Sequence, residues 1–346
     1  MAQTWGKLMI KTDNGELVEA VAPIIISASR STDIPAFHSK WFLNRLAKGY
    51  AIWINPFNRA RQYVSFSKTR VVVFWTKNPK PIISKLVELD KMGVNYYFQY
   101  TLNDYTKEMF EPNVPGLELR IETFKRLSDK IGKEKVIWRF DPLILSDKLS
   151  VDDLLNKVQS IGDKLITHTD KLVFSFADIL EYQKVQNNLI REVEGFSREN
   201  IEQAEFTTDS KALFAEGIKN LLTEWRSVNP EFRIATCAED IPLEKYGIDH
   251  NRCIDDDLMV KLFPTDRALM DFLGYHPDYT IFGYEPQAKL KDKGQRMSCG
   301  CIFSKDIGAY NTCNHLCKYC YANTSSKMVQ TNLKALKDNS ECILPL

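Results

Sequence analysis

The chain has almost no net charge and no long apolar segment, and both absences limit what it can be. Its 46 Lys and Arg residues balance 45 Asp and Glu residues, for a net charge of +1. This balance gives no electrostatic support for a nucleic-acid partner. No apolar run approaches the roughly 20 residues of a membrane span, and residues 1–7 lack the basic-then-apolar order of a signal peptide. We therefore expect a cytoplasmic protein with no membrane partner.

The sequence also lacks repeats and low-complexity segments, and short apolar stretches alternate with amphipathic ones instead. Predicted strands are Pro23–Ser29, Ala51–Asn55, Arg70–Thr76, Asn95–Thr101, Lys135–Phe140, Lys171–Phe176 and Phe232–Thr236. Predicted helices are Pro79–Met92, Leu117–Ile131, Val151–Ile161 and Ala212–Trp225. This alternation indicates an α/β fold with a parallel sheet, and seven or eight such units predict a TIM-like (β/α) barrel.

The alternation of strands and helices lapses in the last third of the chain. We expect residues 1–240 to supply the (β/α) units. Residues 241–346 are predicted to form a cysteine-rich C-terminal portion that completes the barrel.

Polar residues follow nearly every predicted strand. In a parallel barrel the carboxyl ends of all strands meet at one mouth, where such folds place their sites. Turn and helix-cap residues are the alternative interpretation, although arginine, lysine and glutamine are not preferred caps. These polar residues are Ser27, Ser29, Arg30, Ser31, Thr32 and Asp33 after the first strand, Asn55 after the second, Thr76, Lys77 and Asn78 after the third, Gln99, Thr101 and Asn103 after the fourth, Arg139 and Asp141 after the fifth, and Thr236, Cys237 and Glu239 after the last.

Three of the eight cysteines stand in C-x3-C-x2-C spacing near the C-terminus: Cys313, Cys317 and Cys320. In a reducing compartment, cysteines are more typical of metal ligands than of disulfides. Three thiolates can hold three irons of a 4Fe-4S cluster and leave the fourth iron without a protein ligand. Two alternatives stay open: a zinc site with His315 as the fourth ligand, and buried free thiols.

The cysteine spacing, with the aromatic Tyr319 before the last cysteine, resembles the signature of the radical S-adenosylmethionine superfamily. The wider string from Tyr310 to Ala322 is more similar still to the spore-photoproduct-lyase-like branch. Two upstream segments agree with that branch, namely Thr76-Lys77-Asn78 and Glu111-Pro112 with the following helix through Arg120. The chain resembles an uncharacterised bacterial family of unknown function that carries this C-terminal loop.

The resemblance implies an enzyme whose cluster reductively cleaves S-adenosylmethionine to a 5′-deoxyadenosyl radical, which acts on an unknown substrate. It also implies a reductant partner such as flavodoxin or ferredoxin. Lys77 matches a segment that contacts the methionine carboxylate in relatives, and Ser29, Ser31 and Asp33 fall where the amino or ribose groups would lie. Gln99, Thr101 and Arg139 are further candidates for binding the cofactor. No catalytic residue is assigned.

The cysteine loop lies at the C-terminus here, whereas in the superfamily it follows the first strand. A circular permutation would reconcile the two. In that case the predicted strand Asp306–Tyr310 is the topological first strand, Thr324–Leu336 is its helix, and the strand must lie beside Pro23–Ser29. A closed or nearly closed barrel can accommodate this because chain termini usually lie close together at the surface.

Four further cysteines form a possible second metal set, Cys237, Cys253, Cys299 and Cys301, which could hold an auxiliary 4Fe-4S cluster or a zinc ion. Buried free thiols are the alternative for Cys237 and Cys253, and one of the four could instead donate a hydrogen atom. Cys342 is predicted not to be a ligand. A different class of function also stays open, a metal-stapled scaffold or nucleic-acid-binding module without radical chemistry.

Overall fold

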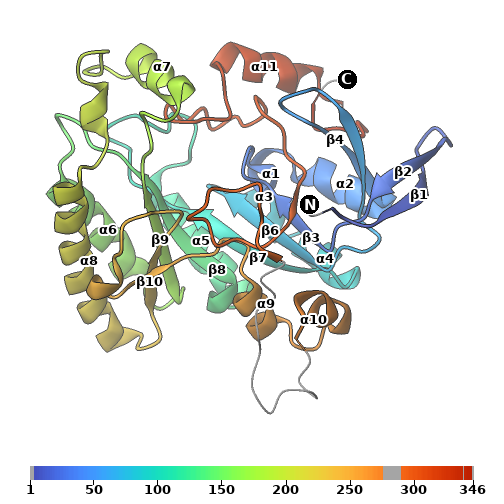
Figure 1. Cartoon of the computed structure of the whole chain (residues 1–346), viewed down its shortest axis with the longest axis horizontal. Helices are drawn as coiled ribbons and strands as arrows, with labels where there is room; N and C mark the ends of the chain where they lie inside the picture. The colour runs from blue at the N-terminus through green and yellow to red at the C-terminus, as the bar shows by residue number, and fades with distance from the viewer. Residues whose placement is uncertain (1–3, 276–289, 338, 345–346) are drawn as a thin grey trace.

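The main feature of the fold is a parallel sheet of eight strands (Figure 1). The structure is a computed structural model and describes residues 4–275, 290–337 and 339–344. Every pair of neighbouring strands in this sheet is parallel. From one edge to the other the order is β12 (Lys305–Asp306), β3 (Ile25–Ala28), β6 (Val71–Thr76), β7 (Asn95–Thr101), β8 (Val136–Leu143), β9 (Lys171–Phe176), β10 (Arg233–Thr236) and β11 (Ile248–His250). The predicted α/β class with a parallel sheet is confirmed.

Helices cover one face of this sheet. Side chains alternate between the two faces along each strand, so neighbouring residues of one strand belong to different cores. Val72 and Phe74 of β6 belong to the core shared with the helices, whereas Val71 and Val73 belong to a second core on the opposite face. The helices of the first core are α1 (Ile34–Phe37), α2 (Ser39–Lys48), α3 (Lys80–Ile83), α4 (Leu86–Lys91), α5 (Leu117–Ile131), α6 (Val151–Leu165), α7 (Gln183–Glu192) and α8 (Thr208–Val228). The single helix predicted for Pro79–Met92 is therefore two, α3 and α4.

The segment that follows β11 covers the other face of the sheet. Its apolar residues in α9 (Asp256–Leu262), α10 (Arg267–Leu273) and residues 290–302 pack against the inner side chains of β3, β6, β7, β8 and β9. Within the described ranges no ladder joins β11 to β12, so the predicted closure into a TIM-like barrel is not found. In a closed barrel, side chains of the strands themselves fill the interior. In this chain, side chains of the segment after β11 pack against the inner face of the sheet instead.

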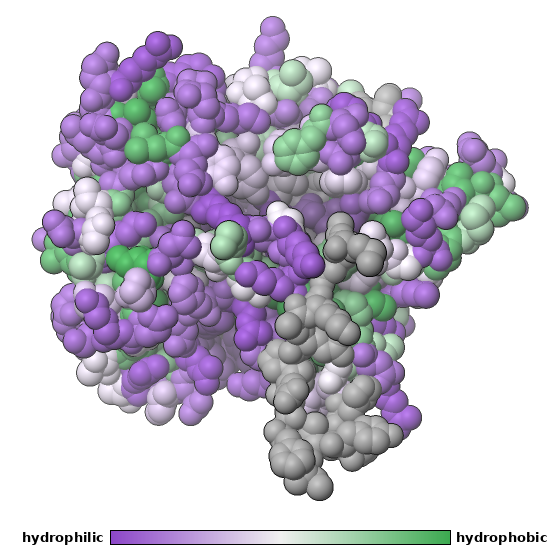
Figure 2. Space-filling model, viewed as in Figure 1, coloured by the Kyte–Doolittle hydropathy of each residue, from purple (hydrophilic) through white to green (hydrophobic). Residues whose placement is uncertain are grey.

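A separate four-stranded sheet stands beside the parallel one, in the order β1 (Lys7–Lys11), β2 (Leu17–Val21), β5 (Arg61–Ser65) and β4 (Tyr50–Ile54). The predicted strand Ala51–Asn55 belongs here, paired antiparallel with β5. Asn55 therefore follows a strand of the small sheet and does not join the candidate site. Figure 2 shows hydrophobic residues gathered on the side of the molecule where β1 and β2 lie. Met9 of β1 and Leu17 of β2 are exposed.

Strand β12 lies beside β3, as the order of the predicted strands requires. Lys305 pairs with Ile26 and Asp306 with Ser27, and the backbone N–H of Ile307 donates to Ser27 O at 3.1 Å. The predicted neighbour relation between the last and the first strand is therefore confirmed, although the strand is Lys305–Asp306 and not the predicted Asp306–Tyr310. The chain then runs through the cysteine loop to α11 (Ser326–Ala335), which lies near the β4 end of the molecule (Figure 1).

Three short 3-10 helices complete the described elements, at Lys133–Lys135, Ile201–Ala204 and Glu244–Tyr246. In the part of the chain that the structure describes, no helix has the length and apolar character needed to cross a membrane.

Candidate functional site: a cysteine loop over the sheet edge

Asp306, the last residue of β12, anchors the cysteine loop to the end of β3. Its carboxylate accepts hydrogen bonds from Ser27 Oγ at 2.9 Å and Ser29 Oγ at 2.8 Å. It also accepts the backbone N–H groups of Arg30 and Gly308, at 2.9 and 2.8 Å. A Cβ atom at Gly308 would lie 1.9 Å from Ser29 Oγ, so this close approach requires glycine. The loop therefore starts at the carboxyl edge of the sheet.

Two asparagine side chains hold the two ends of the loop. Asn188 of α7 donates to the carbonyl of Cys320 at 3.2 Å, and Asn323 donates to the carbonyl of Cys313 at 2.9 Å. Both asparagines are buried. These two bonds fix the ends of the loop, one against α7 and one against the segment that follows Cys320.

The thiols of the loop face a cavity of about 320 Å³ at the carboxyl ends of the parallel strands. Eight of the predicted site residues line it: Cys313, Cys317, Cys320, Ser29, Ser31, Asp33, Lys77 and Thr101. Arg30 and Asp141, also expected at the strand ends, line it as well, and the wall includes Trp75, Ser175, Tyr319 and Tyr321, which were not predicted to bind a ligand. The structure thus brings the loop and most of the predicted strand-end residues to one place.

The three loop thiols lie in surroundings that disfavour their charged form. Burial raises the pKa of Cys313 to about 12, with the charge of Asp33 adding to the effect. Burial raises the pKa of Cys317 well above its usual value, although the Lys77 ammonium opposes it, and it raises the pKa of Cys320 as well. Without a bound cation these side chains are neutral thiols, so a metal would be needed to hold them as thiolates.

The zinc interpretation of the loop does not fit the spacing of its possible ligand atoms. His315 Nε2 lies 2.7 Å from Asp33 Oδ2, its Nδ1 has no hydrogen-bond partner in the described part of the chain, and the residue is only 1% exposed. Among the described residues, the one group of three or more His, Cys, Asp or Glu ligand atoms that converge within 4.8 Å is Asp255, Asp256 and Asp257. A tetrahedral zinc ion needs its ligand atoms that close together, and the loop does not offer them.

Asp33 organises the pocket wall rather than pointing freely into it. Its Oδ1 caps α1 by accepting the N–H of Ala36 at 2.9 Å. Its Oδ2 accepts the backbone N–H of Lys77 at 2.7 Å and contacts His315. One carboxylate therefore joins the end of β3, the end of β6 and the cysteine loop.

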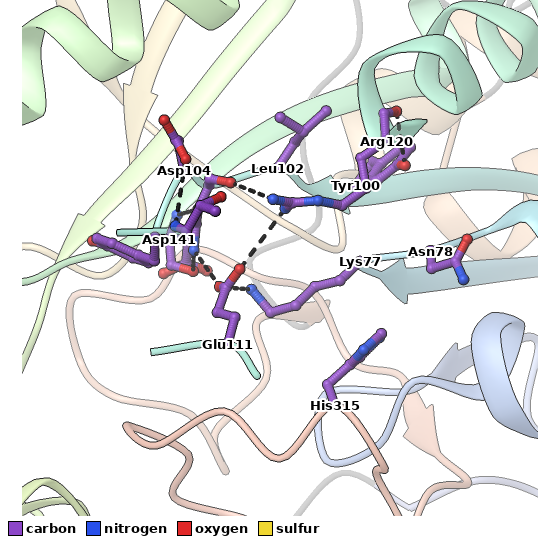
Figure 3. Close-up of polar contacts among 12 residues, drawn as sticks. Lys77, Asn78, Tyr100, Leu102, Asp104, Glu111, Arg120, Asp141 and His315 are labelled. Atoms are coloured by element: carbon purple, nitrogen blue, oxygen red, sulfur yellow. Dashed lines mark hydrogen bonds and ion pairs between the residues drawn. The ribbon is translucent and has the colours of Figure 1, made fainter. Parts of the chain in front are cut away.

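Lys77 belongs to a buried ion network (Figure 3). Its ammonium lies 2.8 Å from Glu111 Oε1 and 3.0 Å from the Tyr319 hydroxyl. Tyr319 also donates to Glu111, and Arg120 Nη1 lies 3.8 Å from Glu111 Oε2. Although burial alone favours the neutral amine, the Glu111 carboxylate raises the pKa of Lys77. Lys77 and Arg120 together lower the pKa of Glu111 despite its burial.

Glu111, Arg120, Tyr319 and Asn103 are site residues that were not predicted to bind anything. Asn103 donates to Glu111 Oε1 at 3.0 Å, and its Oδ1 accepts the N–H of Asp141 at 2.9 Å. The sequence signal for Glu111 and Arg120 was the resemblance of Glu111-Pro112 and the following helix to the spore-photoproduct-lyase-like branch. They lie far from the cysteines in sequence, however, so only the fold brings them to the loop.

The comparisons with known proteins identify the chain's family. A family model described as "Domain of unknown function (DUF1848)" matches residues 25–322. The chain belongs to the DUF1848 family. A search of curated proteins gives no match. Among the solved structures that match is a candidate alpha-L-fucosidase from Bacteroides thetaiotaomicron, at 14% identity over 60% of this chain and 73% of that chain, with a TM-score of 0.23. That likeness is too weak to bear on this DUF1848 chain.

Two predicted cofactor residues of this DUF1848 chain, Gln99 and Arg139, contact the second cysteine set and not the cavity. Gln99 Nε2 donates to the carbonyl of Cys253 at 3.0 Å. Arg139 Nη1 lies 3.0 Å from Cys253 Sγ and 3.2 Å from Gln99 Oε1. Both side chains are buried one layer below the pocket wall. The prediction that they bind the same cofactor as Lys77 is therefore not supported by their contacts.

Proposed function

We propose that this chain is a radical S-adenosylmethionine enzyme with a 4Fe-4S cluster on Cys313, Cys317 and Cys320. The observation that carries the proposal is the shared cavity of these three thiols, Lys77 and Asp33. A cluster held by three thiolates keeps one iron without a protein ligand. Within the described chain no fourth ligand atom converges on the loop thiols, so the open position would belong to a small molecule in the cavity.

The donor set fits such a cluster and not a single ion. Three half-buried thiols lack a convergent fourth ligand within the described chain, yet they line one cavity whose wall also carries Lys77 and Asp33. When bound, the cluster and S-adenosylmethionine would supply a 5′-deoxyadenosyl radical that abstracts hydrogen from a substrate. The substrate itself is not identified by the chemistry of the pocket wall.

Lys77 is the chain's own candidate for binding the cofactor carboxylate. An ammonium has three N–H donors, and two of them reach Glu111 and Tyr319. The third is left for a ligand in the cavity. Two cations and one carboxylate in the Lys77, Glu111 and Arg120 network leave one net positive charge, which suits an anionic group. Apolar wall residues such as Trp75, Phe176 and Ile179 would limit the access of water.

The strand order supports a circularly permuted, open relative of the (β/α) barrel. If β12 is counted as the first strand, the sheet runs in sequential order through β3, β6, β7, β8, β9 and β10 to β11. The cysteine loop then follows the first strand, as the resemblance requires.

The activity test uses anaerobically reconstituted, dithionite-reduced protein with S-adenosylmethionine. We expect 5′-deoxyadenosine to form, and Cys317→Ala to abolish both its formation and the loop cluster. Cys342→Ala is the matched control, since Cys342 is a buried thiol outside both cysteine sets. Wild-type protein with a full cluster and no 5′-deoxyadenosine would contradict the proposal and favour a metal-stapled scaffold.

A further inference from the structure

Four cysteines from three separate segments meet on the inner face of the parallel sheet. Cys237 follows β10 directly, Cys253 follows β11, and the pair Cys299 and Cys301 lies in the segment that covers this face. Three of them are buried and Cys237 is half-buried. Residues so distant in sequence are brought together only by the fold.

The sulfur atoms contact one another and receive polar hydrogens. Cys237 Sγ lies 3.3 Å from Cys253 Sγ. Cys301 Sγ accepts the backbone N–H of Cys253 at 3.2 Å, and Cys253 Sγ accepts the side-chain N–H of Asn251 at 3.2 Å. Hydrogen bonds to sulfur stabilise thiolates and are one means by which proteins tune iron–sulfur clusters. Neutral thiols packed for their apolar character would not need them.

Two arginines lie near the same sulfurs. Arg139 is 3% exposed, its Nη1 lies 3.0 Å from Cys253 Sγ, and its Nη2 pairs with Asp141 Oδ2 at 2.7 Å. Arg30 is half-buried, its Nη2 atom has no hydrogen-bond partner in the described part of the chain, and its charged neighbours include Cys301 and Asp306. The two guanidinium groups would favour thiolates in this set. Thiolates in mutual contact repel one another unless a metal lies between them.

We propose that Cys237, Cys253, Cys299 and Cys301 bind a second metal centre that forms the floor of the pocket. Arg139 on β8 contacts this set, and Asp141, two residues further along the same strand, lines the cavity. Two residues span about 6.6 Å of a strand. The second centre would therefore lie one side-chain layer beneath the space that the cysteine loop covers.

The spacing of the sulfurs is mixed. Zn–S bonds of about 2.3 Å place all four sulfurs of a tetrahedral site within roughly 4 Å of one another, and the 3.3 Å between Cys237 Sγ and Cys253 Sγ falls in that range. In the described chain no three of these cysteine sulfurs fall within 4.8 Å of one another, so the whole set is wider than one ion requires. The metal content therefore decides between an iron–sulfur cluster and a zinc ion.

The experiment separates the two centres by metal content, independently of any reaction. Protein is expressed with added iron, purified anaerobically, and analysed for iron, sulfide and zinc. We expect about eight irons per chain for the wild type and about four for the variant C313A/C317A/C320A. The variant C253A/C301A should keep about four irons and the ability to cleave S-adenosylmethionine to some extent, since the loop is intact.

Cys342→Ala controls for the loss of a buried thiol and should match the wild type. If C253A/C301A does not fold, the loop variant still decides the question through its residual metal and its visible and Mössbauer spectra. About one zinc per chain in the loop variant supports a metal centre on these four cysteines but identifies it as zinc. A loop variant free of both metals, or a Cys237–Cys253 disulfide in anaerobic protein, overturns the proposal. Loss of S-adenosylmethionine cleavage with the second centre intact would speak only against the proposed function.

Discussion

The two cysteine sets differ in how the chain builds them. The loop set comes from eight consecutive residues and faces a cavity, and the Lys77 ammonium lies near its thiols. The second set is assembled from three segments, and none of its cysteines lines the cavity. The Arg139 guanidinium is in direct contact with one of its sulfurs. An open set suits a centre that binds ligands, and an enclosed set suits one that only its own protein contacts. Spacing in the sequence shows the first kind of set and conceals the second.

The largest effect is expected from breaking the ion network on the loop side. Lys77→Met leaves Glu111 buried beside a single distant cation, and removing one partner of a buried pair typically costs about 3–5 kcal/mol of stability. Urea unfolding of the metal-free protein measures this cost. The double variant K77M/E111Q should recover most of the stability, yet it should not recover binding of S-adenosylmethionine. Equal loss in both variants would show that Lys77 acts through packing alone.

A smaller effect is expected on the enclosed side. Arg139→Met removes the N–H directed at Cys253 and leaves Asp141 without its 2.7 Å partner. Hydrogen bonds to charged groups contribute about 1.5–3 kcal/mol. We expect the second centre to be lost first on dilution or chelation while the loop cluster stays, as followed by metal content. Arg139→Lys is the matched control and should retain part of the effect. If Arg139→Met instead lost the loop cluster and kept the second centre, Arg139 would not support the second centre.

Gly308→Ala tests the close approach that seats the loop. The new Cβ would clash with Ser29 Oγ, and overpacking of this kind costs about 1–3 kcal/mol. Thermal unfolding should show the loss, together with weaker binding of the loop cluster. Gly6→Ala is the control, because nothing lies within 4 Å of its Cβ position. A normal loop cluster in Gly308→Ala would mean that β3 and the loop can move apart freely.

The smallest effect concerns pH. The folded-state pKa of Glu111 is lowered, so its stabilising contribution is present above its unfolded pKa and is lost as pH falls through the folded value, below 4.5. The folded-state pKa of Lys77 is raised, so its contribution is present below its unfolded pKa and is lost as pH rises above 10.5. Unfolding free energies at several pH values should therefore vary less for K77M/E111Q than for wild type in both windows. If the unfolding free energies of the two proteins changed with pH to the same extent, the Lys77–Glu111 network would not cause the pH dependence in either window.

The sequence predicted the parallel strands and the helices well, because buried strands and amphipathic helices have distinct apolar patterns. Helix Leu117–Ile131 agrees with α5 at both ends. The strand Ala51–Asn55 exists but lies in the other sheet, since apolar pattern fixes a strand and not its partner. The barrel was expected to close, and no periodicity could show that residues after β11 would cover the inner face.

The candidate site was predicted in part, for a similar reason. Lys77, Ser29 and Asp33 lie beside the loop because the carboxyl ends of parallel strands share one edge. Gln99 and Arg139 lie on the same strands one layer lower, and a list of polar strand ends does not tell which layer a residue occupies. Glu111 and Arg120 were missed as site residues because they precede and lie on a helix, where burial and charge pairing depend on the tertiary fold.

The pairing of β12 with β3 has a consequence for synthesis of the chain. Ser27 and Asp306 are bonded across 279 residues, and domains form from the N-terminus as the ribosome releases them. The backbone groups of β3 that pair with β12 therefore stay unpaired until nearly all of the chain has emerged from the ribosome. Unpaired strand edges invite association with other chains. The same late segment that delivers the three loop cysteines also covers that edge, so assembly of the candidate site and protection of the nascent sheet are a single event.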